Sequence, residues 1–329
     1  MPADQCAARQ DPGVTGSAGL SHEALVYRSD QEFLDGALPI LCRGLDRGEP
    51  VLVAVPAERA KLLRDALGDR SGSVRFEDSE IWCAIPGWTL GALNGYLRRD
   101  RSGARVWVLA EALWDAGGPA RAAEWSRMQS VLNVAFASAT ASVVCAYDAG
   151  ALSPATIAAA RATHPGLTSG GQSAISAGYQ PPAQYAAASP PSLNSPPVDA
   201  EAVSFDVRAL GSVRRWAQTW ADRQALGEDH ARDLLIAVHE IVSNAVEHGG
   251  GSGIARFWGS PESLFCEVTS PGVLTHPFPG YLPPDLGQPR GRGLWMARQI
   301  CTQVDVRSGP RGVDVRLTFS RTLTAPAPD

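Results

Sequence analysis

A proline-rich segment divides the 329-residue sequence into two parts. Residues 168–200 contain Pro-Pro pairs set among Ser, Ala and Gln, with few apolar residues. A segment of this composition cannot bury a core and is typical of a semi-extended linker. We therefore predict two domains, at 20–167 and 201–322. Residues 1–19 lack hydrophobic periodicity and are expected to form a disordered leader, and 323–329 form a short tail.

Short apolar runs alternate with helical stretches in the first domain. The apolar runs lie at 50–55, 105–109 and 141–147. The helical stretches lie at 33–46, 58–67 and 120–137. Continuous apolar runs are typical of strands buried on both faces, and their alternation with helices predicts βαβ units. We expect an α/β domain with a mainly parallel sheet.

The basic residues exclude one large class of nucleotide-binding proteins. Lys61 is the only lysine among 29 basic residues, and it follows Ala60. A phosphate-binding loop of the G-x-x-x-x-G-K-[ST] type requires a lysine directly after glycine. The parallel sheet is therefore expected to lack a P-loop.

The second domain shows a different order of elements. Two helices at 209–226 and 228–248 come first, followed by strands at 254–258 and 264–269. A Pro/Gly-rich stretch at 271–293 leads into a helix at 293–303, and strands at 304–308 and 313–319 follow. Helices followed by strands predict an α+β layered sandwich.

The helix segment Asp233–Gly249 carries the first candidate site. Its apolar residues gather on one arc at about 100° per residue. Glu240 and Asn244 lie one turn apart on the other side, and His248 continues that line. A carboxylate and an amide oxygen in this arrangement could hold Mg²⁺ against phosphates and position an attacking hydroxyl. Periodicity alone favours the alternative of a solvated polar face.

A second candidate site begins the helix at 293–303. Gly291 and Gly293 lie at its N-terminus, where free N–H groups and the helix dipole attract anions. Arg290 or Arg292 could add charge-assisted hydrogen bonds. The Gly-x-Gly pair alone is weak evidence, but the ordered set of Glu-x-x-x-Asn helix, Pro-Gly turn, long loop and Gly-x-Gly-Leu helix is far more specific.

Residues 201–320 resemble the GHKL-type ATPase domain of the small anti-sigma-factor kinases. The string His239–Gly249 looks like the N box of that family, and Gly291–Leu294 looks like its second glycine box. The resemblance implies a Bergerat-type α/β sandwich that binds ATP and Mg²⁺. It implies Glu240 as the catalytic base and Asn244 as the Mg²⁺ ligand.

The first glycine box departs from this family pattern. The family carries an aspartate ahead of its glycine, and that carboxylate accepts a hydrogen bond from the adenine amine. Ser270 occupies this position here, before Pro271 and Gly272. Losing a charge-assisted bond costs roughly 1.5–3 kcal/mol, or a ten- to hundredfold loss of affinity. Weak ATP binding, an altered nucleotide preference and a lapsed site all stay open. Residues 272–293 would be the lid over the nucleotide.

The first domain resembles the MEDS sensory domain over residues 20–167. The resemblance rests on His22–Tyr27, on Gly44 and the Gly48-Glu-Pro-Val stretch, on Val144–Asp148 and on His164-Pro165. It implies a RecA-like sheet without a P-loop that senses a small organic molecule.

Two groups of residues are candidates for ligand sensing in this domain. Glu111 and Asp148 follow strands, at the edge where open α/β sheets bind ligands. His22, Cys145 and His164 could meet around a metal or a ligand. Scattered residues of this kind are more often packing residues, so we do not predict a metal here.

Charge and hydropathy narrow the range of partners. The net charge of -5 argues against a protein that neutralises many nucleic-acid phosphates. No apolar run approaches the ~20 residues that cross a bilayer, and the N-terminus lacks the pattern of a signal peptide. We expect a cytoplasmic protein with no direct nucleic-acid or membrane partner.

The two resemblances together predict a signal-responsive anti-sigma regulatory factor. It would phosphorylate a serine or threonine of an anti-anti-sigma partner with ATP, which would free it to hold its sigma factor. A homodimer is implied by the resemblance alone. The main alternative is a non-catalytic sensor and binding module, which Ser270 favours. A sensor histidine kinase has less support, because the only His-acid pairs, His22-Glu23 and His239-Glu240, lie on no dimerising hairpin.

Overall fold

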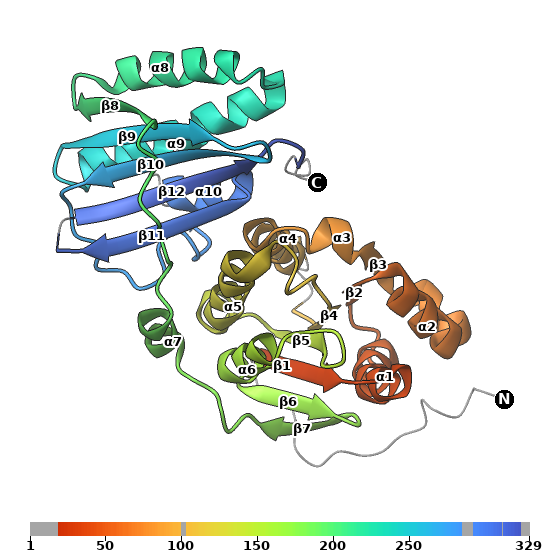
Figure 1. Ribbon diagram of the computed structural model, residues 1–329. Coiled ribbons are helices and arrows are strands. Elements are labelled where there is room, and N and C mark those ends of the chain that lie inside the picture. The colour runs from red at the N-terminus through yellow and green to blue at the C-terminus, as the bar shows by residue number, and fades with distance from the viewer. Residues whose placement is uncertain (1–18, 100–102, 285–291, 311, 324–329) are drawn as a thin grey trace. The chain divides into compact units, whose positions relative to one another are not determined.

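The computed structural model describes residues 19–99, 103–284, 292–310 and 312–323. The chain divides into two compact units, Met1–Ala186 and Ala187–Asp329, which are described separately here (Figure 1). The predicted leader and tail lie outside the described residues, apart from Gly19 and Leu323.

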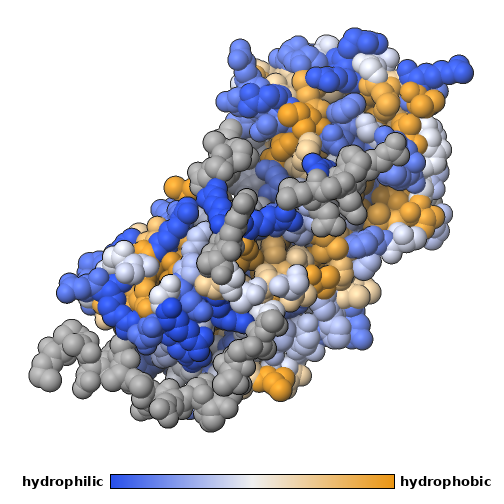
Figure 2. Space-filling model, turned by 180° about the vertical axis from the view of Figure 1, so that it is seen from behind, coloured by the Kyte–Doolittle hydropathy of each residue, from blue (hydrophilic) through white to orange (hydrophobic). Residues whose placement is uncertain are grey.

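None of the helices in the described ranges combines the length and the apolar composition that crossing a bilayer requires. On the face drawn in Figure 2, hydrophobic and hydrophilic residues are interspersed.

The first unit is built on a seven-stranded sheet of order β3-β2-β4-β5-β1-β6-β7. Its strands are β1 (Leu20–Tyr27), β2 (Val51–Val55), β3 (Arg75–Asp78), β4 (Val106–Ala110), β5 (Ala141–Asp148), β6 (Gly166–Ser169) and β7 (Gln172–Ile175). All neighbours pair in parallel except β6 and β7. Every residue of β2 and β4 is buried, which confirms that their continuous apolar runs belong to a parallel sheet covered on both faces.

Helices cover both faces of this sheet (Figure 1). The helices are α1 (Asp30–Asp46), α2 (Ala57–Leu67), α3 (Ser79–Trp82), α4 (Pro86–Arg99), α5 (Gly118–Ala135), α6 (Pro154–Thr163) and α7 (Pro182–Ala188). Helices α1 and α2 pack together on one face, and α5 packs with α4 and α6 on the other. Only two residues, Arg28 and the N-cap Ser29, connect β1 to α1. A P-loop has eight residues and does not fit there, in agreement with the absence of a Gly-Lys pair.

The start of the predicted linker at 168–200 is part of the first unit. Residues 166–175 form the β6–β7 hairpin, and β6 extends the sheet by pairing in parallel with β1. Thr168 and Ser173 donate hydrogen bonds to the Glu23 carboxylate. Residues 168–175, which were predicted to belong to the linker, therefore form part of an edge hairpin. Their polar composition reflects the hydroxyl groups that face the Glu23 carboxylate on β1.

The second unit is an antiparallel sheet with helices against one face (Figure 1). Its strands, in the order β11-β12-β10-β9-β8, are β8 (Glu201–Asp206), β9 (Ser252–Gly259), β10 (Ser263–Ser270), β11 (Gln303–Gly309) and β12 (Gly312–Ser320). Its helices are α8 (Leu210–Arg223), α9 (Glu228–Glu247) and α10 (Gly293–Ile300). This confirms the predicted α+β sandwich, to which sequence analysis had not assigned β8.

Alternation along the strands places the core of the second unit between helices and sheet. Cys266 and Val268 of β10 are buried beside Leu317 of β12. From the helices, Trp220 is fully buried and its ring lies 5.4 Å from that of Phe257. This core fixes the positions of α9 and β10, which carry the candidate site.

The opposite face of this sheet carries charged groups and part of the predicted linker. Arg316 of β12 forms an ion pair with Glu267 of β10 at 2.5 Å, and both side chains are largely buried. Arg316 also donates to the backbone carbonyl of Asn194, and Arg307 donates to that of Leu193. Residues 193–194 are therefore fixed on the outer face of the sheet.

Candidate functional site

The N-terminus of α10 lies directly against the polar side of α9. A Cβ atom added to Gly293 would lie 2.7 Å from Oε2 of Glu240 and 2.8 Å from Nδ2 of Asn244. Only glycine allows this approach. Glu240 and Asn244 are half-buried, so the alternative of a freely solvated helix face does not describe them. The two predicted sites therefore form one.

A cavity of about 210 Å³ lies between α9, α10 and the sheet. Four of the predicted residues, Asn244, Ser270, Gly272 and Leu294, line it. Most of the wall is apolar and comes from Ile241, Ala245, Val268, Val273, Leu274, Leu294, Val306, Val313 and Val315. Apart from Leu294, sequence analysis had not assigned these wall residues to the site, because they come from five separate segments of the chain. An apolar slot with a few polar groups suits a flat heteroaromatic ring.

Glycines bring the end of α9 against the turn after β10. A Cβ atom on Gly272 would lie 2.5 Å from Cα of Gly249, and one on Gly249 would lie 2.7 Å from Oγ of Ser270. Ser270 is only 6% exposed, and no described residue forms a hydrogen bond with its hydroxyl. Its donor and acceptor are therefore available to a molecule in the cavity.

The described part of the predicted lid, residues 272–284, is attached to α10. The buried Arg298 donates to the carbonyls of Pro279, at 3.1 Å, and of Val304, at 2.8 Å. Its guanidinium lies 3.6 Å from the centre of the Tyr281 ring. Sequence analysis missed Arg298, because its partners lie in a loop without periodicity. A cation in the last turn of a short helix was the available signal.

The remaining predicted residues of this site are placed only in part. Arg290 and Gly291 lie outside the described residues. Arg292 occupies the N-cap of α10. The role assigned to the two arginines stays a prediction. His248, which caps the C-terminal end of α9, lines the cavity.

Polar side chains gather at the carboxyl ends of β1, β4 and β5 in the first unit. Tyr27 donates to Oε1 of Glu111 at 2.7 Å, and Arg59 donates to the Tyr27 hydroxyl at 3.2 Å. Arg59 also forms ion pairs with Asp148, at 3.5 Å, and with Asp30. The structure thus brings the predicted Glu111 and Asp148 together through Arg59. Sequence analysis missed Tyr27 and Arg59.

Glu111 has an unusual electrostatic environment. It is 8% exposed, and its Oε2 has no hydrogen-bond partner among the described residues. Burial raises the pKa of Glu111 to about 7, although the Tyr27 hydrogen bond and the charge of Arg59 lower it. A carboxyl group that titrates near neutrality at a strand end is a candidate for ligand binding.

The raised pKa of Glu111 predicts a pH-dependent stability. The unfolded carboxyl titrates near 4.5 and the folded one near 7, so the folded state holds the proton more tightly and loses stability as pH rises between these values. Glu111→Gln cannot titrate, and its stability relative to wild type should grow by up to about 3 kcal/mol from roughly pH 5 to pH 8. Scanning calorimetry measures this difference. The exposed Glu80→Gln is the control, and a constant difference for Glu111→Gln would contradict the prediction.

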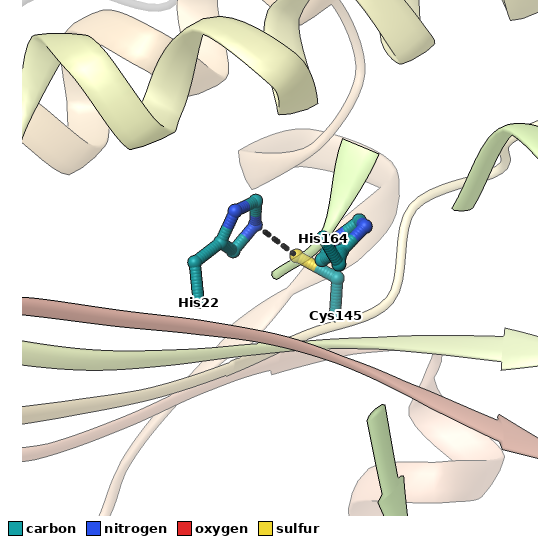
Figure 3. Close-up of side chains that lie close together, drawn as sticks. All are labelled: His22, Cys145 and His164. Atoms are coloured by element: carbon teal, nitrogen blue, oxygen red, sulfur yellow. Dashed lines mark hydrogen bonds between the residues drawn. The ribbon is translucent and has the colours of Figure 1, made fainter. Parts of the chain in front are cut away.

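His22, Cys145 and His164 converge on the face of the first sheet that α5 and α6 cover. His22 and Cys145 project from the paired strands β1 and β5, and His164 caps α6 (Figure 3). One possible ligand atom from each residue lies within 4.8 Å of the other two. All three side chains are buried. The structure brings these three residues together, and α5 adds Gln129 and Asn133, which sequence analysis missed.

The fold and the sites define a protein in which a parallel α/β domain precedes an antiparallel α/β sandwich with a ligand cavity. Residues 21–165 match the family model described as MEDS, the methanogen/methylotroph DcmR sensory domain. Residues 203–319 match the histidine kinase-like ATPase domain. The chain therefore consists of a MEDS domain followed by a histidine kinase-like ATPase domain, which supports a regulatory, ATPase-like sensor. No curated protein matches the chain.

Proposed function

We propose that this protein is a signal-responsive anti-sigma regulatory factor whose second domain binds Mg·ATP and phosphorylates a serine or threonine of an anti-anti-sigma partner. The observation that carries the proposal is the contact of Gly293 with Glu240 and Asn244 beside an apolar cavity. The MEDS domain would bind a small organic ligand and adjust this activity. The protein would act in the cytoplasm as a homodimer and hold a sigma factor when its partner is phosphorylated.

The described residues fit a magnesium nucleotide. The apolar wall, which includes Val268 and Val315, can accept a flat base, and Ser270 can form a hydrogen bond with that base. The Asn244 amide oxygen is a suitable Mg²⁺ ligand. The first N–H groups of α10, from Gly293 onward, have no intrahelical acceptor and favour phosphate oxygens.

The chemistry proposed for the site needs few groups. Bound Mg·ATP would supply the phosphoryl group. Glu240 lies one turn from Asn244 and would accept the proton of the partner's hydroxyl. Asn244 and the start of α10 would hold the phosphates in line with that hydroxyl, so catalysis is mainly positioning and charge stabilisation.

A non-catalytic binding module is the second candidate function. Ser270 favours it, because a buried hydroxyl replaces the carboxylate that the resemblance leads us to expect at the base. In this case the same cavity would bind ATP too weakly for turnover, and the domain would only grip its protein partners. Autophosphorylation on histidine has less support, since His239 is exposed beside Glu240 and lies inside the site helix.

Calorimetric titration of the full chain with Mg·ATP tests the proposal. We expect micromolar affinity for the wild type and a loss of at least about tenfold in Asn244→Ala, which removes the amide oxygen. His239→Ala, on the exposed side of the same helix, should bind like wild type. Absence of binding at millimolar Mg·ATP would contradict a nucleotide site. Binding weaker than micromolar, without phosphorylation of any candidate partner, would leave the binding module as the function.

A further inference from the structure

The hydrogen bonds around His22 determine which of its nitrogens carries a proton. Asn133 donates through Nδ2 to the carbonyls of Ser130 and Thr163, so its Oδ1 is the acceptor toward Nδ1 of His22 at 3.0 Å. His22 therefore donates from Nδ1. In the neutral ring of this tautomer, Nε2 carries a lone pair.

His164 is fixed in the same way. Its Nδ1 lies 2.7 Å from the carbonyl of Ala160, which can only accept, so Nδ1 carries the proton. Its Nε2 therefore has a lone pair, and this buried atom has no hydrogen-bond partner among the described residues. An unpaired buried acceptor is costly, and it requires an explanation.

The His22 Nε2 lone pair has only a weak donor beside it, the Cys145 thiol at 3.8 Å. The Oε1 atom of Gln129, itself an acceptor, lies closer, at 3.0 Å. The Cys145 thiol donates to this oxygen at 3.3 Å. The His22 nitrogen and the Gln129 oxygen are both acceptors and repel each other at this distance. Either a reversed Gln129 amide or a cation between the two atoms removes this repulsion.

These three atoms have the spacing of metal ligands. Their separations are 3.0, 3.3 and 3.8 Å. Ligands at about 2.0–2.3 Å from a tetrahedral metal ion lie about 3.3–3.5 Å apart. One possible ligand atom of His164 lies within 4.8 Å of those of His22 and Cys145, so four groups surround the position. The backbone and amide acceptors behind both Nδ1 atoms match the outer partners that orient metal-binding histidines.

We propose that the MEDS domain holds a tetrahedral divalent transition metal on His22, Cys145 and His164, with the Gln129 side-chain oxygen as the fourth ligand. Nitrogen and sulfur ligands of this kind favour Zn²⁺ over Mg²⁺ or Ca²⁺. Because a metal binds the thiolate, binding would displace the proton of the Cys145 thiol to solvent. The site is independent of the proposed nucleotide site, and its test does not depend on ATP binding.

Metal analysis of the full chain tests this proposal. Because the ligands are buried, the protein is produced in medium supplemented with Zn²⁺ or Co²⁺ and then washed with chelator. We expect about one metal ion per chain, and for Co²⁺ a thiolate charge-transfer band and the strong visible bands of tetrahedral coordination. A chain that retains no metal, or only octahedral Co²⁺, would overturn the proposal.

Matched variants separate this site from metal on surface histidines. Cys145→Ser should lose the charge-transfer band, whereas Cys83→Ser, another buried free thiol, should keep it. Metal content unchanged in Cys145→Ser would overturn the proposal. Gln129→Glu gives a second measurement if substituted ligands prevent folding. A carboxylate binds the cation more strongly, so this variant should hold Zn²⁺ at least about tenfold more tightly in chelator competition. Weaker retention of Zn²⁺ by Gln129→Glu would contradict the assignment of Gln129 as the fourth ligand.

Discussion

Replacing Gly293 with alanine should lower the affinity for Mg·ATP by at least about tenfold and leave the fold intact. The new Cβ would lie within 2.8 Å of the ends of the Glu240 and Asn244 side chains. Both ends can rotate away, and only the contact with Cβ of Glu240, at 3.2 Å, requires a small shift of α10, so folding loses little. The same rotation moves the carboxylate and the amide out of the site. Titration calorimetry measures the affinity, and thermal unfolding measures the fold.

Gly309→Ala is the matched control for this substitution. Gly309 lies in the same unit, and a Cβ there would meet no atom within 4 Å. We expect it to bind Mg·ATP like the wild type. Gly293→Ala with wild-type affinity would show that the close contact between α9 and α10 does not form the nucleotide site. A variant that loses stability together with affinity would instead identify the contact as structural.

Local periodicity predicted most of the fold because the helices are amphipathic and the strands are buried on defined faces. The predicted helix at 228–248 is α9, and the apolar arc on it is the side that packs on the sheet. Runs such as 50–55 and 141–147 correspond to β2 and β5. In each case one segment carries the whole signal, as an apolar stripe along α9 or as a continuous apolar run in β2 and β5.

Elements and residues whose role depends on a distant partner were missed. The β6–β7 hairpin has a polar composition, and its place in the sheet depends on pairing with β1, far away in the chain. Arg59 joins the ends of β1, β4 and β5 from α2, and nothing near it in sequence indicates this. Conversely, Glu240 and Asn244 could be predicted because one helix turn places them together.

Ser270→Asp is expected to raise the affinity for Mg·ATP by about ten- to hundredfold. Ser270 is at the end of β10, and its side chain lines the cavity without a described partner. A carboxylate there would accept a charge-assisted hydrogen bond from the adenine amine. Guanine presents a carbonyl oxygen at the matching position and would be repelled. Calorimetry with Mg·ATP and Mg·GTP should therefore show a gain for ATP alone.

Ser270→Asn separates charge from size in this experiment. The amide is nearly isosteric with the carboxylate but carries no charge, so its gain for ATP should be small, and its NH₂ group can donate to guanine. An equal gain in both variants would mean that the larger side chain at position 270 adds packing contacts and that its charge plays no part. No gain in Ser270→Asp would place the base elsewhere in the cavity. A gain for ATP in the aspartate variant alone would show that the residue at position 270 recognises the adenine. It would also show that the natural sequence binds ATP less tightly because it lacks one charge.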